Sequence, residues 1–373
     1  MLRSLRASST GRAHFYCSSG GNAGLACAVA ARTLGQPCDV FVPSLTPEHV
    51  LGKLSRIGAT PHRAGTSWPE ADAACRSAVA SDPEGVYVPP FDHKLIWEGA
   101  SSLVDELVAL EDKGFFPAAG DSGDEDAGGV DAIVCSVGGG GLLNGIMTGV
   151  ERHYGDSSTE SQLRRQQRRP VVIAIETLGT DSLAASIRAG AHVTIPGITS
   201  VATSLGAPRV SAESYRWAEV CKATTFTFPL SSSPTPPLTP DVDAALATTI
   251  SFGSTSAPAL AEINTNTIAN TNTSTDTNAK PTPKLVSAVV ADAHAVSACT
   301  RFVDDERLLV EVACGATIAS AYNPALLRAA FGFGPAGMDD EAWAKKNLVL
   351  VVCGGSSISM DMLAKYQVQF GIC

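Results

Sequence analysis

Short apolar segments that alternate with longer amphipathic segments constrain the fold of this 373-residue chain most strongly. Each apolar segment has strand length, and the stretch that follows it has helical spacing and ends at Gly or Pro. We predict strands at residues 14–17, 38–42, 86–88, 130–137, 171–175 and 348–353, and helices at residues 23–34, 47–57, 67–79, 95–110, 142–153 and 183–189. Such alternation favours open parallel sheets with right-handed crossovers, so we expect an α/β fold.

Composition and charge exclude several classes of protein. The net charge is −10, and the one dense basic run, at 164–169, is expected to be a solvated loop, which argues against a nucleic-acid partner. No segment reaches the roughly 20 apolar residues needed to cross a bilayer, so we expect no membrane partner. The ten cysteines form no CxxC pair and no Cys/His ligand spacing, which argues against zinc. We expect an enzyme that acts on a small molecule.

The first residues leave two compartments open. Arg3, Arg6 and Arg12, several serines and the absence of any acid before Asp39 resemble a mitochondrial transit peptide. However, the following residues enter a predicted strand without a spacer, and the scattered free cysteines suit a reducing compartment. We therefore expect a cytoplasmic protein, with a mitochondrial location as the alternative.

Four consecutive glycines follow one predicted strand and precede a predicted helix: Gly138, Gly139, Gly140 and Gly141. Without side chains, their backbone N–H groups can converge on an anion, and the helix start adds its positive end. No GK[ST] follows, and the loop lacks the GxGxxG spacing with a later acid, so it suits neither nucleoside triphosphates nor dinucleotides. We interpret it as a phosphate cradle, with a flexible turn as the alternative.

A second loop, Cys-Ser-Ser-Gly-Gly-Asn at 17–22, offers hydroxyls, backbone amides and one carboxamide at a predicted helix start. Either Ser19 or Asn22 could be a helix N-cap. The same amides could instead hold a carboxylate. Both interpretations stay open on the loop alone. Asp92 and His93 suggest acid–base chemistry, but a turn after two prolines is the expected role.

Six motifs together resemble one family. They are HFYCSSGGNAGLACAVAARTLG, VPPFDHKLIWEGASSLVDEL, GGGGLL, ITSVATSLGAP, DDERLLVEVACGA and VVCGGSSIS, and they run in family order from residue 13 to about residue 358. The chain resembles the fold-type II, tryptophan synthase β-like pyridoxal-phosphate enzymes, on the L-serine/L-threonine dehydratase (serine ammonia-lyase) branch. Cysteine synthase, tryptophan synthase β and serine racemase carry different sequences around the asparagine loop.

The resemblance implies two open parallel-sheet domains with pyridoxal 5'-phosphate in the cleft between them, and a homodimer. We expect the small domain at 1–91 and the large domain at 92–373. The implied activity is β-elimination of L-serine to pyruvate and ammonia, and of L-threonine to 2-oxobutanoate. The alternatives are a non-catalytic cofactor-binding or regulatory protein, or a different β-elimination or racemisation enzyme of this fold.

Residues 229–283, which are rich in Thr, Asn and Pro, interrupt the family pattern. Their low hydrophobicity and low complexity predict a disordered insertion. We expect that its removal, with a short linker, leaves the cofactor cleft intact.

The resemblance also assigns roles to residues of this sequence. It implies that Asn22 bonds the ring oxygen of the cofactor and that Cys353 faces the pyridine nitrogen. The implied substrate-carboxylate loop contains Ser19, Gly20 and Ala23. The implied phosphate loop contains Gly138, Gly139, Gly140, Gly141 and Leu142.

A monovalent cation such as K+ is implied at Glu176. Its expected companions are Thr180 and the carbonyls of Leu205 and Ala207. A polar strand end is the alternative role for Glu176.

The chain departs from the family in one respect. The family bonds its cofactor to a lysine, the Schiff-base lysine, in a Ser-x-Lys-x-Arg-Gly segment just upstream of the asparagine loop. Here 21 residues precede Asn22 and none is lysine, since the first lysine is Lys53. We therefore assign no catalytic lysine within the chain, expect it upstream of Met1, and expect residues 1–373 alone to be inactive.

Overall fold

The computed structural model describes residues 1–117, 128–155, 165–228, 284–331 and 340–372. The chain divides into two units, and the second, Ser231–Lys280, lies outside the described residues. The predicted insertion at 229–283 lies outside them too. All of the described residues belong to the first unit, Met1–Leu230 with Pro281–Cys373.

Four parallel strands form the first sheet, in the order β3-β2-β1-β4: β1 is His14–Cys17, β2 Cys38–Val42, β3 Thr60–Arg63 and β4 Gly85–Tyr87. Alternate residues of β2 point inward, and Val40 and Val42 join Phe15 in one apolar core. The sequence does not predict β3, because its four residues, TPHR, are polar and include Pro61. The strand lies at the edge of the sheet, where a proline without an N–H is tolerated.

Five helices belong to the same stretch of chain: α1 Leu2–Ala7, α2 Asn22–Thr33, α3 Glu48–Ile57, α4 Trp68–Ser81 and α5 Lys94–Glu111. Those predicted at 23–34, 47–57, 67–79 and 95–110 are confirmed with ends shifted by one or two residues. The ring Nδ1 of His93 accepts a hydrogen bond from the N–H of Leu95 at 3.2 Å. His93 therefore caps α5 in the turn expected after the two prolines.

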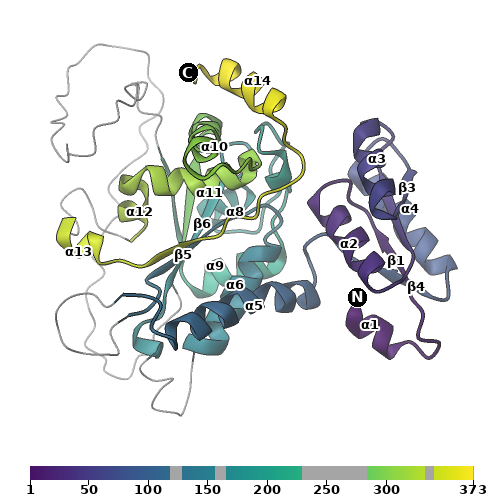
Figure 1. Ribbon diagram of the computed structural model, residues 1–373, viewed down its shortest axis with the longest axis horizontal. Coiled ribbons are helices and arrows are strands. Elements are labelled where there is room, and N and C mark those ends of the chain that lie inside the picture. The colour runs from purple at the N-terminus through teal and green to yellow at the C-terminus, as the bar shows by residue number, and fades with distance from the viewer. Residues whose placement is uncertain (118–127, 156–164, 229–283, 332–339, 373) are drawn as a thin grey trace. The chain divides into compact units, whose positions relative to one another are not determined.

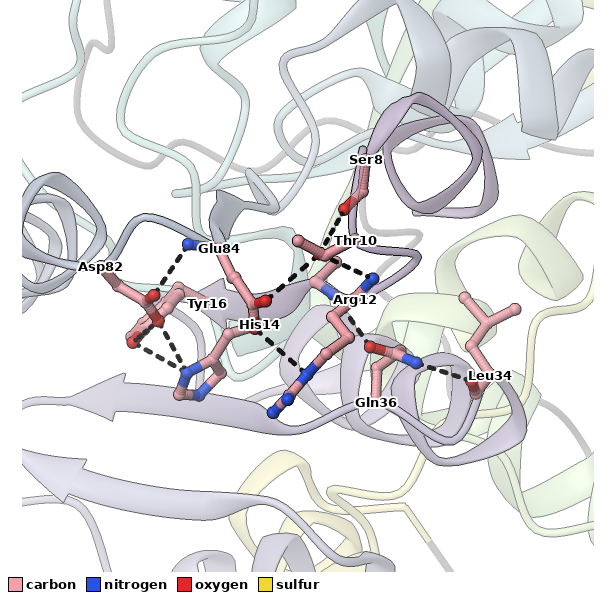
Figure 2. Close-up of polar contacts among 10 residues, drawn as sticks. Ser8, Thr10, Arg12, His14, Tyr16, Leu34, Gln36, Asp82 and Glu84 are labelled. Carbon is pink, nitrogen blue, oxygen red and sulfur yellow. Dashed lines mark hydrogen bonds and ion pairs between the residues drawn. The ribbon is translucent and has the colours of Figure 1, made fainter.

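Polar side chains gather at the amino ends of the strands of the first sheet (Figure 2). Arg12 forms an ion pair with Glu84, and Nδ1 of His14 lies 2.9 Å from an Asp82 carboxylate oxygen. The Tyr16 hydroxyl donates to the same oxygen at 2.8 Å. In a parallel sheet the loops that carry a binding site follow the carboxyl ends of the strands. This network thus lies at the opposite end of the strands from the predicted site.

The second sheet contains five parallel strands in the order β7-β8-β6-β5-β9: β5 is Ala132–Ser136, β6 Val171–Thr177, β7 Thr224–Thr227, β8 Leu285–Val290 and β9 Leu348–Leu350. Every residue of β6 is buried, as expected for the central strand of a parallel sheet covered on both faces. The sequence does not predict β7 or β8, because residues 229–283 interrupt the alternation between them.

Helices cover both faces of this sheet: α6 Gly141–Tyr154, α8 Ser182–Ala189, α9 Ala212–Val220, α10 Asp292–Glu306, α11 Val312–Tyr322, α12 Pro324–Ala330, α13 Asp340–Ala344 and α14 Met360–Phe370, with a short turn at Thr203–Leu205. Residues of α5, α6 and α9 pack with Ile133 and Cys135, whereas residues of α10 and α11 pack with Ala132 and Val134 (Figure 1). Adjacent residues of β5 therefore face two separate cores, which confirms the predicted α/β fold with two parallel sheets.

Two further observations concern expectations from the sequence. Among the described residues, no helix has the length and apolar character needed to cross a membrane. The two sheets draw their strands from 14–87 and 132–350, but the domain boundary near residue 91 stays a prediction.

Candidate cofactor and substrate site

The four glycines form a tight connection between the end of β5 and the start of α6. A Cβ on Gly139 would lie 2.3 Å from the ring of Phe91, and one on Gly140 would lie 1.9 Å from the hydroxyl oxygen of Ser214. Gly140 also has φ +90°, a conformation that favours glycine. The loop is thus closely packed against its neighbours, which argues against a flexible turn.

This glycine loop offers free donors to an anion. In the described part of the chain, the N–H groups of Gly138, Gly139 and Gly140 donate no hydrogen bond. They lie at the N-terminus of α6, whose dipole adds positive potential. Leu142 follows in the first turn of this helix. The residues present therefore fit a phosphate group.

A polar network behind the loop holds it in place, and the sequence analysis missed this network. The N–H of Ser211 donates to the carbonyl of Gly139 at 3.0 Å. The side chain of Asn144 donates to the Ser211 hydroxyl at 2.8 Å and accepts from the Ser214 hydroxyl at 2.8 Å. All three side chains are buried. Their sequence contexts gave no signal, because serine and asparagine in helices are common on surfaces.

Asn22 begins α2, and both ends of its side-chain amide form hydrogen bonds with protein groups. Its amide nitrogen donates to both carboxylate oxygens of Glu311, each at 3.1 Å. Its amide oxygen accepts from the N–H of Ser356 at 3.2 Å. The structure thus brings the predicted asparagine into contact with the loop that follows Cys353.

Glu311 is the main residue of the site that sequence reasoning missed. It is buried and also accepts hydrogen bonds from the hydroxyl of Ser204 and, at 2.7 Å, from the N–H of Ser357. A Cβ on Gly355, which has φ +119°, would lie 2.2 Å from the Glu311 carboxyl carbon. A usable signal existed in the motif VEVACGA, where this one acid precedes a helix without charged residues, α11.

The predicted carboxylate loop lies between β1 and α2. The hydroxyl oxygen of Ser19 accepts from the N–H of Gly21 at 3.3 Å, and a Cβ on Gly24 would lie 1.7 Å from the Ser19 carbonyl oxygen. The loop therefore packs directly on the first turn of α2, which contains Ala23. Side-chain capping of α2 by Ser19 or Asn22 is absent, since the N-cap residue is Gly21 and α2 has no side-chain cap bond within the described chain.

Cys353 follows β9 and is exposed. A hydrogen bond from the buried thiol of Cys314 lowers the pKa of the Cys353 thiol. The carbonyl of Gly354, 3.2 Å from the Cys314 sulfur, is the alternative acceptor for this one S–H group. Cys353 is thus an accessible thiol on the same loop as Ser356, which contacts Asn22.

Glu176 lies at the carboxyl end of β6, fully buried. Its two carboxylate oxygens accept from the N–H groups of Leu183 and Ala184, each at 2.8 Å, in the first turn of α8. Burial raises the pKa of Glu176 to about 8, although these two hydrogen bonds oppose the shift. The carboxylate therefore has no cationic side chain in hydrogen-bond contact among the described residues.

Two of the other predicted cation ligands, Thr180 and Leu205, form hydrogen bonds with protein groups. The Thr180 hydroxyl pairs with that of Thr177 at 2.7 Å, and the Leu205 carbonyl accepts from the N–H of Ala207 at 2.7 Å. The buried hydroxyl of Ser182, six residues after Glu176, has no hydrogen-bond partner among the described residues. No group of three or more His, Cys, Asp or Glu side chains in the described chain could hold a metal ion.

Comparison with known proteins identifies the family of the chain. Residues 1–227 match the family model described as pyridoxal-phosphate dependent enzyme. The mouse L-serine dehydratase/L-threonine deaminase is 33% identical over 362 residues, which cover 96% of this chain and 81% of the relative. A yeast L-serine dehydratase (Saccharomyces cerevisiae) is 28% identical over 361 residues, covering 95% of this chain and 80% of the relative.

Solved structures show the same fold. A fungal L-serine ammonia-lyase from Rhizomucor miehei superposes with a TM-score of 0.64 and 25% identity, covering 99% of this chain and 85% of that structure. A threonine deaminase from Solanum lycopersicum gives 0.59 and 16%, covering 95% and 73%. The chain therefore belongs to the fold-type II family of pyridoxal-phosphate-dependent enzymes and is similar along nearly its whole length to L-serine dehydratase/L-threonine deaminase.

Proposed function

We propose that this chain forms the cofactor and substrate site of an enzyme that converts L-serine to pyruvate and ammonia, and L-threonine to 2-oxobutanoate and ammonia. The observation that carries the proposal is the glycine loop at the start of α6, whose N–H groups have no partner among the described residues. Asn22 at the start of α2 lies in contact with the loop that follows Cys353. Similarity to serine and threonine dehydratases supports the choice of substrates.

Each group of residues has one task in this proposal. The N–H groups of Gly138, Gly139 and Gly140 hold the cofactor phosphate. Asn22 orients the ring by a hydrogen bond to its oxygen, and Cys353 faces the ring nitrogen. The loop of Ser19 and Gly20 binds the substrate carboxylate. The bound cofactor supplies the electron sink that allows the α-proton and then the β-hydroxyl to leave.

A monovalent cation belongs to this proposal as a structural component. Glu176 is a buried carboxylate whose pKa is raised by burial, so a nearby cation would favour its charged form. The unpartnered hydroxyl of Ser182 supplies an oxygen that a cation would satisfy. We propose K+ as the ion and the carbonyls of Leu205 and Ala207 as further ligands.

We also propose that residues 1–373 by themselves do not turn over substrate. Among the described lysines, Lys53 donates to the carbonyl of Ser356, whereas Lys345 and Lys346 pair with Glu341 and Asp131. The ammonium of Lys53 is thus held by a backbone oxygen on the rim of the site. This contact makes Lys53 the lysine to test if turnover is found.

Binding of ligands tests the proposed function without turnover. We expect the chain to retain pyridoxal phosphate in equilibrium dialysis and, once loaded, to bind L-serine and L-threonine more tightly than D-serine. A chain that binds no pyridoxal phosphate, or that binds D-serine as tightly as L-serine, would contradict the proposal.

A further inference from the structure

Ser18 is a fully buried polar residue at the point where β1 ends and the predicted carboxylate loop begins. Its hydroxyl donates to a carboxylate oxygen of Asp72 at 2.6 Å and lies 3.2 Å from the hydroxyl of Tyr87. Its carbonyl accepts a hydrogen bond from the indole nitrogen of Trp68 at 2.7 Å. Side chains from α4 and from the end of β4 therefore hold Ser18 by both its side chain and its backbone.

Asp72 is the centre of this anchor. The oxygen that accepts from Ser18 also accepts from the Tyr87 hydroxyl at 2.5 Å, and the other oxygen accepts from Nε of Arg76 at 2.7 Å. The guanidinium of Arg76 lies 4.1 Å from the centre of the Tyr87 ring. Burial opposes ionisation of Asp72, but the hydrogen bonds from Ser18, Tyr87 and Arg76 outweigh it and lower its pKa. Hydrogen bonds to a charged acceptor are stronger than those between neutral groups.

The position of Ser18 determines the position of the loop after it. Ser19 packs against α2, because its carbonyl oxygen occupies the space that a Cβ on Gly24 would fill. A Cβ on Gly20 would lie 3.1 Å from a methyl group of Val42, so the loop is also close to β2. With one end fixed by Ser18 and the other by α2, a small shift at Ser18 would displace the N–H groups of the loop.

We propose that Asp72, together with Trp68, is a positioning residue that sets the affinity of the site for the carboxylate of its amino-acid substrate. The inference rests on the proposed function, in which the loop of Ser19 and Gly20 binds this carboxylate. Asp72 and Trp68 contact Ser18 and act on the substrate through it. The ligand class is an α-amino acid with a free carboxylate.

A merely structural role would have a different consequence. If Asp72 only docked α4 on the sheet, its loss would lower stability and weaken every ligand alike. Asp105 provides a matched control, because it is also a helical carboxylate that accepts hydrogen bonds from an arginine, Arg152, and its pKa is also lowered by its hydrogen bonds, first of all that from His153. It lies on α5, and its hydrogen bonds within the described chain do not reach Ser18.

The test measures two ligands in four proteins loaded with pyridoxal phosphate. Equilibrium dialysis of radiolabelled L-serine and, separately, of pyridoxal phosphate is carried out with the unchanged chain, Asp72→Asn, Trp68→Phe and Asp105→Asn. We expect Asp72→Asn and Trp68→Phe each to weaken L-serine binding about tenfold. Retention of pyridoxal phosphate should change less than about twofold, and Asp105→Asn should change neither ligand.

Three other results of the dialysis experiment would overturn the positioning role of Asp72 and Trp68. Equal L-serine affinity in Asp72→Asn, Trp68→Phe and the unchanged chain would overturn the positioning role and leave the proposed function intact. Parallel loss of both ligands in Trp68→Phe, which keeps an aromatic ring at an exposed position, would show a general structural role and also overturn it. If the unchanged chain retains pyridoxal phosphate but binds no L-serine, the proposed function fails and the positioning role fails with it.

Discussion

Glu311 shows how a single side chain defines the site before any ligand enters. It accepts from Asn22, Ser204 and Ser357, so within the described residues this buried carboxylate receives hydrogen bonds from neutral donors alone. Because the amide nitrogen of Asn22 donates to both oxygens of Glu311, the asparagine is held in one orientation. The two carboxylate oxygens can share one N–H of the amide, so the second N–H of Asn22 is available for the predicted hydrogen bond to the cofactor ring. Glu311, the N-cap residue of α11, thus fixes the orientation of the asparagine that is predicted to contact the cofactor ring.

The first residue-scale prediction concerns the glycine loop. Gly140→Asp should weaken retention of pyridoxal phosphate far more than Cys353→Ser. The aspartate would place its Cβ 1.9 Å from the Ser214 hydroxyl oxygen and add a negative charge to an anion cradle. Serine at 353 keeps a small hydrogen-bonding group. Equilibrium dialysis measures both affinities.

Gly190→Asp is the control for backbone strain in this comparison. Gly190 also has a positive φ, +58°, but a Cβ there would meet nothing within 4 Å. It should therefore lower stability without a selective loss of cofactor. Equal affinities in Gly140→Asp and Cys353→Ser would show that the glycines do not hold the phosphate.

The second residue-scale prediction concerns the cation. Without K+, Ser182→Ala should leave the thermal midpoint unchanged or raise it, because it removes a buried hydroxyl that has no partner in the described chain. With K+ in excess, the unchanged chain should gain a few °C and the variant less. Differential scanning calorimetry in KCl and in tetramethylammonium chloride measures the difference. An identical gain in both proteins would contradict Ser182 as a ligand.

At the scale of elements, close packing of α5 on α6 depends on two glycines of α6. A Cβ on Gly145 would lie 2.4 Å from that of Ala100, and one on Gly149 would lie 2.6 Å from that of Val104. The two helices thus approach each other more closely than any larger residue allows. Because α6 begins at the glycine loop, this packing also fixes the helix end that faces the predicted phosphate.

Two alanine substitutions should therefore have opposite signs. Gly149→Ala should destabilise the fold by about 1–3 kcal/mol, because the new methyl group overlaps Val104. Gly99→Ala, at an exposed position of α5 with nothing within 4 Å, should stabilise it by about 0.5–1 kcal/mol, the ordinary gain in a helix interior. The urea concentrations at the unfolding midpoints of the two variants and of the unchanged chain measure these stability changes. Two changes of the same sign would refute the packing argument.

Elements could be predicted from the sequence where a local pattern determines them. The strands at 14–17 and 38–42 and the helices between 23 and 110 follow apolar spacing and Gly or Pro stops, and the structure confirms them. The edge strand β3 could not be predicted, because its own sequence is polar and contains a proline. It forms a strand because it pairs with β2. Likewise, the roles of Glu311, Ser211 and Ser214 depend on contacts with segments distant in the sequence. The spacing of residues along the chain does not reveal such contacts. The tight glycine loop could be recognised from the sequence because the lack of side chains is itself the signal, and its role as a phosphate cradle stays a prediction.

Strands β7 and β8 add a condition to the prediction about residues 229–283. They pair in parallel, with Thr224 opposite Val286 and Thr227 opposite Val289. The connection must therefore return from the end of one strand to the start of the next, which takes about a dozen residues or more.

Replacement of 229–283 by a flexible linker of about 15 residues should leave cofactor retention and the thermal midpoint nearly unchanged. A linker of about four residues should lower the midpoint because it cannot span the crossover. Loss of cofactor with the long linker would contradict the prediction.

At the scale of the whole molecule, cofactor binding and turnover make separate demands. In the proposed function, binding needs the phosphate cradle and the ring contacts, which come from loops at the carboxyl ends of β1 and β5 and after β9. Turnover, as proposed, would also need an amine placed over the substrate α-carbon. Among the described lysines, Lys53 on α3 contacts a site loop through the carbonyl of Ser356.

The last prediction follows from this separation. Residues 1–373, loaded with pyridoxal phosphate, should release no pyruvate from L-serine above the rate of free cofactor. General-base assistance alone is commonly worth about 10²–10⁴ in rate, so its absence is easily measured. Lactate dehydrogenase with NADH reports pyruvate continuously, and dialysis confirms that the cofactor is retained.

Two variants are tested beside the unchanged chain: Lys53→Met, and Lys365→Met at an exposed position of α14. Pyruvate release that Lys53→Met abolishes and Lys365→Met preserves would contradict the prediction and make Lys53 the base.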